Sequence, residues 1–244
     1  MCRMVGVVYR SKFPTFIFRD LQHVSQVGRI PGEKEPGHKD GWGLVAFDGG
    51  KPSYIGRSTR PIFLDPSFDA ALGFAAKLSG PNIAIGHARA ASKGGATLAN
   101  THPFIRNGIA LGHNGTIRNF EPRTTGKPKG ETDTERLLFL LSDRLDEKKD
   151  LAAALTSVIR EDLGGREFSA AVLLVSDGNR LFGYRDYEKD DRAMYYDLRL
   201  AACEDCVVFY QETSMDQGKN TSQVAKGELV SVGKDLKVAR RNML

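Results

Sequence analysis

The 244-residue sequence has few cysteines and no long apolar run. Its three cysteines, Cys2, Cys203 and Cys206, are too few for the disulfide framework of a small secreted protein, and this scarcity fits a reducing cytoplasm. No apolar stretch approaches the ~20 residues of a membrane-spanning helix, and the N-terminus lacks the charged and apolar regions of a signal peptide. We therefore expect a cytoplasmic protein with no membrane partner.

Cys203 and Cys206 form a C-x-x-C pair that lacks the further ligands of a metal site. No second pair of cysteines and no histidine lies near them, whereas zinc requires about four ligands. We expect two free thiols with a structural or incidental role, and a redox role is the alternative. No sequence motif supports a metal, nucleotide or flavin cofactor, so we expect none.

The chain is basic overall, but its basic residues are spread along the sequence. The formal net charge is +5 and the pI is about 9.1, values that also occur among nucleic-acid-binding proteins. The basic residues are scattered, however, and prolines, glycines and Glu121 interrupt the densest stretch, residues 118–129. We expect a basic surface that favours anionic substrates, and no nucleic-acid partner.

The order of expected elements indicates the fold class. Apolar residues at helical spacing occupy residues 15–27, 65–80, 132–145 and 150–164. Strand-like runs cover residues 1–9, 41–47, 52–57, 82–89, 102–106, 108–114, 168–175, 180–184, 195–202, 207–211 and 228–232, and a basic tail ends the chain. Strands and helices do not alternate, which disfavours a doubly wound parallel sheet. We predict an α+β protein with mixed or antiparallel sheets flanked by helices, forming one domain over residues 1–244.

The first residues carry a candidate nucleophile. Cys2 directly follows the initiator Met1 and becomes the N-terminal residue if an aminopeptidase removes that methionine. An α-amine titrates near ~7.7 to 8.0 and a free thiol near ~8.5, so the amine of Cys2 could act as base for its own sulfur. The alternative is that Cys2 is a small apolar residue buried on a first strand.

Four further stretches contain residues suited to binding an amino acid. They are Gly86-His87-Ala88-Arg89-Ala90-Ala91-Ser92, Asn100-Thr101-His102-Pro103-Phe104, His113-Asn114-Gly115-Thr116 and Thr132-Asp133-Thr134-Glu135. Arg89 offers a rigid fork for a carboxylate, and Asp133, at an expected helix start, can receive an ammonium group. Asn-Gly after a strand supplies a side-chain amide and an unhindered backbone N–H, the two donors of an oxyanion hole. Taken singly, these stretches are more often a strand end, a turn or a helix cap.

Together and in this order, the stretches resemble the class II glutamine amidotransferases, glutaminase domains of the N-terminal-nucleophile hydrolase superfamily. The resemblance covers nearly the whole chain, from Cys2 through Gly227-Glu228-Leu229-Val230. It implies a four-layer αββα sandwich of two mainly antiparallel sheets flanked by helices. It also implies a small-molecule substrate, glutamine or a γ-glutamyl compound.

The resemblance also implies a role for each site residue. Cys2 would be the nucleophile, with its α-amine as base, and Asn114 and the amide of Gly115 would form the oxyanion hole. Arg89, assisted by Ser92, would hold the substrate α-carboxylate, and Asp133 would bind the α-ammonium. His102 would shape the pocket, although it could equally cap the loop before Pro103, while His87 and His113 would orient loops.

One departure from the family pattern concerns the segment Gly37-His38-Lys39-Asp40-Gly41-Trp42-Gly43. Members with an attached synthase domain carry Arg-Gly ahead of an Asp-x-x-Gly segment. The Asp-Gly-Trp-Gly found here is similar to the small stand-alone branch, which includes amidotransferase-like proteins of unassigned acceptor and γ-glutamyl hydrolases. We also expect no synthase domain after Leu244.

Three functions therefore stay open at this point. The first is a glutaminase that hydrolyses glutamine through a Cys2 thioester and passes ammonia to a separate synthase subunit or releases it. The second is a γ-glutamyl amide or peptide hydrolase that needs no partner. The third is a binding module on the same fold that has lost its activity.

Overall fold

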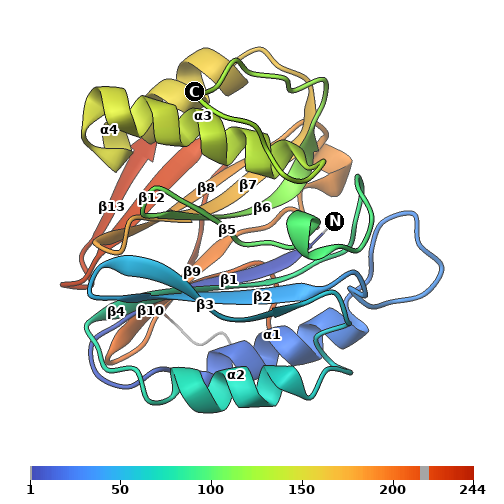
Figure 1. The fold of residues 1–244 in the computed structure, drawn as a ribbon, viewed down its shortest axis with the longest axis vertical. Helices are drawn as coiled ribbons and strands as arrows, with labels where there is room; N and C mark the ends of the chain where they lie inside the picture. The colour runs from blue at the N-terminus through green and yellow to red at the C-terminus, as the bar shows by residue number, and fades with distance from the viewer. Residues whose placement is uncertain (1, 215–219) are drawn as a thin grey trace.

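The computed structural model describes residues 2–214 and 220–244. Two β-sheets lie face to face, and two helices cover the outer face of each, giving four layers (Figure 1). All the strand pairs among the described residues are antiparallel. The predicted αββα sandwich is confirmed, whereas the prediction of one domain over residues 1–244 stays a prediction.

The first sheet has seven strands and lies against α1 and α2. Its order is β11 (Thr221–Gln223), β9 (Arg199–Ala202), β10 (Cys206–Tyr210), β1 (Arg3–Tyr9), β4 (Asn82–Ala88), β2 (Trp42–Asp48) and β3 (Lys51–Ser58). Helices α1 (Thr15–Val27) and α2 (Ser67–Ala75) pack on its outer face through one apolar cluster. The central strand is therefore β1, the strand that begins directly after Cys2.

The second sheet has six strands and lies against α3 and α4. Its order is β13 (Val238–Asn242), β12 (Glu228–Gly233), β8 (Arg180–Tyr187), β7 (Phe168–Ser176), β6 (Ile109–Ile117) and β5 (Phe104–Arg106). Helices α3 (Asp133–Lys148) and α4 (Leu151–Ser157) cover its outer face. Short helical turns at Leu98–Asn100 (η1), Val158–Leu163 (η2) and Asp190–Arg192 (η3) complete the helical segments of the described chain.

Strand β1 shows why this sequence forms a buried central strand. All seven of its residues are buried, because one face meets the helices and the other meets the second sheet. Val5 and Val7 belong to the cluster under α1 and α2, whereas Met4 and Val8 belong to the cluster between the sheets. Because both faces are covered, the run that follows Arg3 is apolar and shows no polar alternation. β1 pairs with β10 and β4, which holds its N-terminal end rigidly.

Two expected elements differ from the structure. The chain end, expected as a basic tail, forms strand β13, whose five residues are all exposed. It joins the sheet through backbone hydrogen bonds to β12. Its charged side chains keep this edge of the sheet from pairing with a further strand. Because all its side chains are exposed, the sequence of β13 shows no apolar period. The helix expected to run to residue 164 changes at Ser157 into the π-helical turn η2.

The expectation of two free thiols at Cys203 and Cys206 is wrong. The structure joins them in a disulfide across the turn between β9 and β10. That turn brings their Cα atoms to 4.9 Å, and the Cys203 N–H donates to the Cys206 carbonyl over 2.8 Å. Spacing alone did not indicate this turn. The cytoplasmic location, which rested partly on the scarcity of cysteines, stays a prediction.

Within the described ranges, none of the helices combines the length and the apolar composition that crossing a bilayer demands.

The packing between the sheets yields a stability prediction. Leu174 on β7 is fully buried in the cluster between the sheets, whereas Leu98 is 45% exposed. Leu174→Ala should lower the free energy of unfolding by about 2 to 5 kcal/mol, because it leaves a cavity in a close-packed core. Leu98→Ala, the matched control, should change it by less than about 0.5 kcal/mol. Urea unfolding measures both, and equal effects would contradict the described core.

Candidate active site

A small pocket opens beside the start of β1. It is lined by residues from segments far apart in the sequence, namely Cys2, Arg89, Ser92, His102, Gly115 and Asp133, together with Ala90, Ala91, Lys93, His113, Thr132 and Thr134. Its volume is about 20 Å³, room for little more than a water molecule. All the site residues predicted from the sequence line this pocket except Asn114, which is fully buried next to it.

Cys2 is held at this pocket by three contacts. Its backbone N–H donates to Asn114 Oδ1 over 2.8 Å, and its Sγ lies 3.7 Å from the Ala90 carbonyl oxygen. The guanidinium of Arg3 donates to the Cys2 carbonyl over 3.3 Å and to Glu212 Oε2 over 2.6 Å. Cys2 is 6% exposed, so its sulfur and nitrogen are fixed beside the pocket rather than free in solvent.

Asn114 connects the two sheets at this point. It lies on β6, and its Oδ1 receives the N–H of Cys2 at the end of β1. Its Nδ2 donates to Gln211 Oε1 over 3.2 Å, which fixes the orientation of the amide. Sequence reasoning missed Gln211, because nothing marks it except its place directly after the strand β10.

Gly115 occupies a position that only glycine can fill. Its φ is 146°, and a Cβ there would lie 1.8 Å from the Ala170 carbonyl oxygen. The pairing of β6 with β7 shifts register between Gly115 and Ile117, which is the local distortion of a β-bulge. Bulges commonly re-aim the backbone next to functional sites.

Arg89 is buried, and its guanidinium faces a loop. Nη1 donates to the Gly95 carbonyl over 3.0 Å, and Nη2 donates to the carbonyls of Lys93 and Gly94 over 2.8 and 3.2 Å. A guanidinium has five N–H groups, so these contacts leave the Nε hydrogen and one Nη1 hydrogen. The loop of residues 93–95 therefore occupies part of the fork that was predicted to hold a carboxylate.

Asp133 is the first residue of α3 and is buried. Its carboxylate accepts the N–H groups of Ile117 and Thr134 over 2.5 and 3.0 Å. The predicted capping by Thr132 is present, since its hydroxyl accepts the Glu135 N–H over 3.2 Å. In a capping box the Glu135 carboxylate would also accept the Thr132 N–H. Here it accepts the N–H groups of Lys129 and Gly130 instead. The helix start is thus tied to the preceding loop as well as to itself.

Ser92 lies at the exposed rim of the pocket. Its hydroxyl is 2.8 Å from that of Thr116, two residues after Asn114. Sequence reasoning quoted Thr116 but gave it no role. The contact links the loop after β4 to the end of β6.

Three histidines lie under and beside the pocket. The rings of His87 and His102 stack with centroids 4.6 Å apart, and His113 bonds through Nδ1 to the Thr134 hydroxyl over 2.9 Å. Burial, reinforced by the nearby positive groups, lowers the pKa of His102 well below its ordinary value. Burial also lowers the pKa of His87 to about 3, although a hydrogen bond to the His113 carbonyl opposes this. The rings of His87 and His102 are therefore neutral at neutral pH and fill the space behind the pocket.

The segment Asp40–Gly43 supports the pocket wall. The Asp40 carboxylate accepts the Ala91 N–H over 2.7 Å, and the Asp40 N–H donates to the Arg89 carbonyl over 2.9 Å. A Cβ on Gly43 would lie 2.4 Å from the His102 carbonyl oxygen. This glycine therefore allows the chain at His102 to approach strand β2 closely.

The buried histidines produce a pH dependence of stability. Below about pH 6.5 an unfolded histidine binds a proton, whereas folded His87 stays neutral down to about pH 3. The free energy of unfolding should therefore fall as pH drops through this window, by up to ~1.4 kcal/mol per pH unit for each such histidine. His87→Gln should flatten this slope, and the exposed control His23→Gln should leave it unchanged. Urea unfolding at several pH values measures the slope, and equal slopes in all three proteins would contradict a neutral buried His87.

The chain is similar to known proteins over most of its length. A family model described as glutamine amidotransferases class-II matches residues 1–240. An uncharacterized protein of Methanocaldococcus jannaschii, MJ1515, is 28% identical over 197 residues, covering 77% of this chain and 51% of that protein. Escherichia coli YafJ, named as a candidate glutamine amidotransferase, is 29% identical over 197 residues, covering 75% of this chain and 72% of YafJ.

A solved structure shows the same fold. Glutamine phosphoribosylpyrophosphate amidotransferase from B. subtilis superposes with a TM-score of 0.67 at 19% identity, covering 100% of this chain and 49% of that one. The chain thus spans about half the length of this enzyme and of the M. jannaschii protein. Since the family match extends over residues 1–240, the chain belongs to the class-II glutamine amidotransferases.

Proposed function

We propose that this chain hydrolyses the side-chain amide of glutamine through a thioester on Cys2, and that the ammonia passes to a separate protein or is released. The observation that carries the proposal is the convergence of Cys2, Arg89, Gly115 and Asp133 on one pocket, with Asn114 bonded to the Cys2 nitrogen. These residues supply a nucleophile, a cation, an anion and two amide donors. An α-amino acid with a side-chain carbonyl needs this set of partners.

The nucleophile and its base belong to the same residue. Removal of Met1 converts the Cys2 nitrogen into an α-amine, which takes the thiol proton as the sulfur attacks the amide carbon of glutamine. The protonated amine then gives its proton to the leaving nitrogen, so ammonia departs and the thioester remains. Water attacks the thioester, the amine takes a proton from that water, and glutamate is released with the thiol restored. The hydrogen bond to Asn114 Oδ1 holds the nitrogen in place during these transfers.

The oxyanion of each tetrahedral intermediate is stabilised by Asn114 and Gly115. One hydrogen of Asn114 Nδ2 is taken by Gln211, which leaves the second for the oxyanion. The Gly115 backbone, distorted by the bulge, supplies the other donor at the pocket surface. Fixed donors of this kind need no reorganisation when charge develops.

Each charged group of the substrate binds to a side chain of the opposite charge. Asp133 receives the ammonium, and Arg89, with Ser92 at the rim, receives the carboxylate. Because the loop of residues 93–95 now bonds to Arg89 and the pocket is small, glutamine binding requires this loop to release the guanidinium. The carboxylate then replaces the carbonyl oxygens, and the neutral His102 ring closes the pocket from behind.

The test is glutamate release from L-glutamine by the protein with Met1 removed, checked by intact mass. Cys2→Ala should reduce the rate to background, because no other group in the pocket can form the thioester. The matched control replaces the other two cysteines, Cys203→Ala with Cys206→Ala, and should keep the parent rate, since their disulfide lies on the β9–β10 turn. A Cys2→Ala variant as active as the parent would refute the proposal. Release of glutamate from γ-glutamyl peptides but not from glutamine would assign the chain to γ-glutamyl hydrolysis instead.

Asn114 gives a separate kinetic prediction. Loss of one oxyanion donor typically costs ~10²- to 10³-fold in kcat, so Asn114→Ala should lower kcat by this amount with a much smaller change in KM. The control Asn179→Ala removes an exposed amide on the β7–β8 turn and should change neither constant. Steady-state kinetics with L-glutamine measure both. An effect of Asn114→Ala confined to KM would exclude the oxyanion role.

A further inference from the structure

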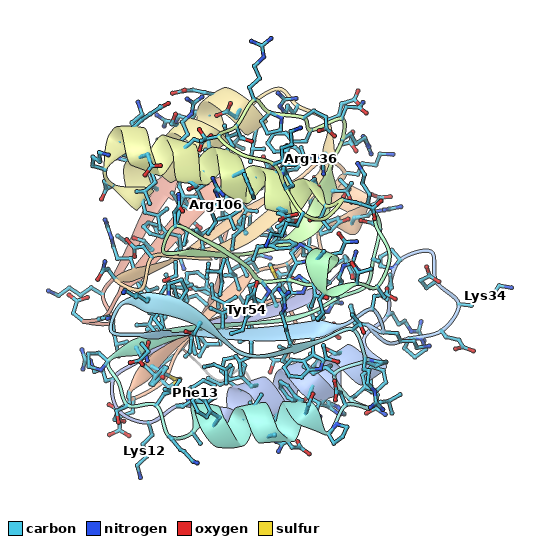
Figure 2. All side chains as sticks on the ribbon, in the orientation of Figure 1. Lys12, Phe13, Lys34, Tyr54, Arg106 and Arg136 are labelled. Atoms are coloured by element: carbon cyan, nitrogen blue, oxygen red, sulfur yellow. A yellow bond between two sulfur atoms is a disulfide. The ribbon has the colours of Figure 1, made fainter. Side chains whose placement is uncertain are left out.

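A second and larger cavity lies beside the candidate active site, where the edges of the two sheets meet. Its volume is about 360 Å³. β3 forms the edge of the seven-stranded sheet and β5 the edge of the six-stranded sheet, so no further strand of the described residues covers this opening. Figure 2 shows Arg106 below helix α3 and Tyr54 on the strand of the other sheet beneath it. Both side chains line the cavity.

The cavity carries an excess of positive charge. Arg57, Arg106 and Lys129 line it, and none of the three forms an ion pair with a carboxylate in the described part of the chain. Glu135 is the one carboxylate on its wall among the described residues, and its two oxygens already accept the amides of Lys129 and Gly130. Three cations against one occupied carboxylate favour an anionic ligand.

Aromatic rings lie close to two of these guanidinium groups. The Arg106 Cζ lies 3.8 Å from the centroid of the Phe139 ring, and the Arg57 Cζ lies 4.4 Å from that of Tyr54. Arg106 donates through Nη2 to the Thr125 carbonyl over 2.8 Å, while its shielded Nε has no hydrogen-bond partner among the residues that the structure describes. The fork of N–H donors on a guanidinium matches a carboxylate or a phosphate.

The cavity and the candidate active site share a wall. The ring of Phe104, which lines the cavity, is 4.7 Å from the ring of His102, which lines the Cys2 pocket. The Tyr54 hydroxyl donates to the Pro103 carbonyl, between these two residues, over 3.1 Å. The contacting rings of His102 and Phe104 therefore lie between the two spaces.

We propose that this cavity is a second ligand site, for a small molecule that joins a phosphate or carboxylate to a ring. The anionic group binds between the guanidinium groups of Arg57 and Arg106, and the ring packs on Phe104 and Tyr54. The site uses no group of the Cys2 pocket, so binding does not depend on the hydrolytic activity. Its position next to His102 suits a molecule that reacts with the ammonia made there, a consequence that rests on the proposed function.

The experiment is isothermal titration calorimetry with phenyl phosphate, which combines a dianion with a ring. Inorganic phosphate and benzoate are the two partial probes that separate the phosphate, carboxylate and ring contributions. Saturable binding with one site is expected for the parent and for Cys2→Ala. Loss of a hydrogen-bonded charge should weaken binding at least about tenfold in Arg57→Gln and in Arg106→Gln.

The control is Arg241→Gln, which removes one exposed positive charge from β13, away from this cavity. It should bind phenyl phosphate like the parent, and Lys129→Gln supplies a third test if Arg106→Gln fails to fold. Absence of saturable binding to the parent would overturn the second site. So would equal weakening by Arg241→Gln, or loss of binding in Asp133→Asn, which would place the probe in the Cys2 pocket. Binding by a protein that does not hydrolyse glutamine would leave this site intact and refute only the proposed function.

Discussion

The hydrogen bond from the Cys2 nitrogen to Asn114 Oδ1 joins the end of β1 in one sheet to β6 in the other. Every group of the pocket is placed relative to this contact, because Cys2 comes from the first sheet and Gly115 and Asp133 come from the side of the second. A buried hydrogen bond is electrostatically stronger than one in water. Leaving its donor or acceptor unpaired lowers the stability of the fold. The two sheets therefore cannot slide at this edge without separating the proposed nucleophile from its proposed oxyanion donors.

The walls of the pocket depend on close backbone packing. Gly43 lets the chain at His102 approach β2, and Gly115 lets β6 pass against the Ala170 carbonyl. Behind them, buried histidines with lowered pKa values act as neutral space-filling rings, since their charged forms would lose solvation. The rigidity of this framework contrasts with the loop of residues 93–95, which now bonds to Arg89. In the proposed function, that loop is the part that must move.

The two cavities differ in the charges on their walls. The Cys2 pocket has an anion at Asp133 and a cation at Arg89, which suits a zwitterion, whereas the second cavity has an excess of cations and suits an anion. The contacting rings of His102 and Phe104 lie between them, and His87 stacks on His102. Phe104 belongs to β5, the short edge strand, so the wall between the cavities is also the edge of a sheet. A ligand in the second cavity would therefore contact Phe104, whose ring packs against the His102 ring of the Cys2 pocket.

Local patterns in the sequence were sufficient for the α+β class and for most elements. The apolar period marked α1 at residues 15–27, and the unbroken apolar run after Cys2 indicated a buried strand. The same patterns failed for β13, whose exposed charged residues carry no period, and for Cys203 and Cys206, because a turn rather than their spacing brings them together. The predicted site residues came from short motifs whose chemistry is visible in the residue types alone.

What only the tertiary structure decided is which atoms meet. Gln211 binds the Asn114 amide, Thr116 meets Ser92, and the carbonyls of residues 93–95 occupy the fork of Arg89. None of these contacts has a local signal, because each joins segments whose approach is set by sheet packing and loop closure rather than by neighbouring residues. The sequence by itself determined the kinds of groups available for chemistry and the periods of the strands and helices. Their distances, their burial and the second cavity depend on the stacking of two sheets, which side chains distributed over the whole chain stabilise together.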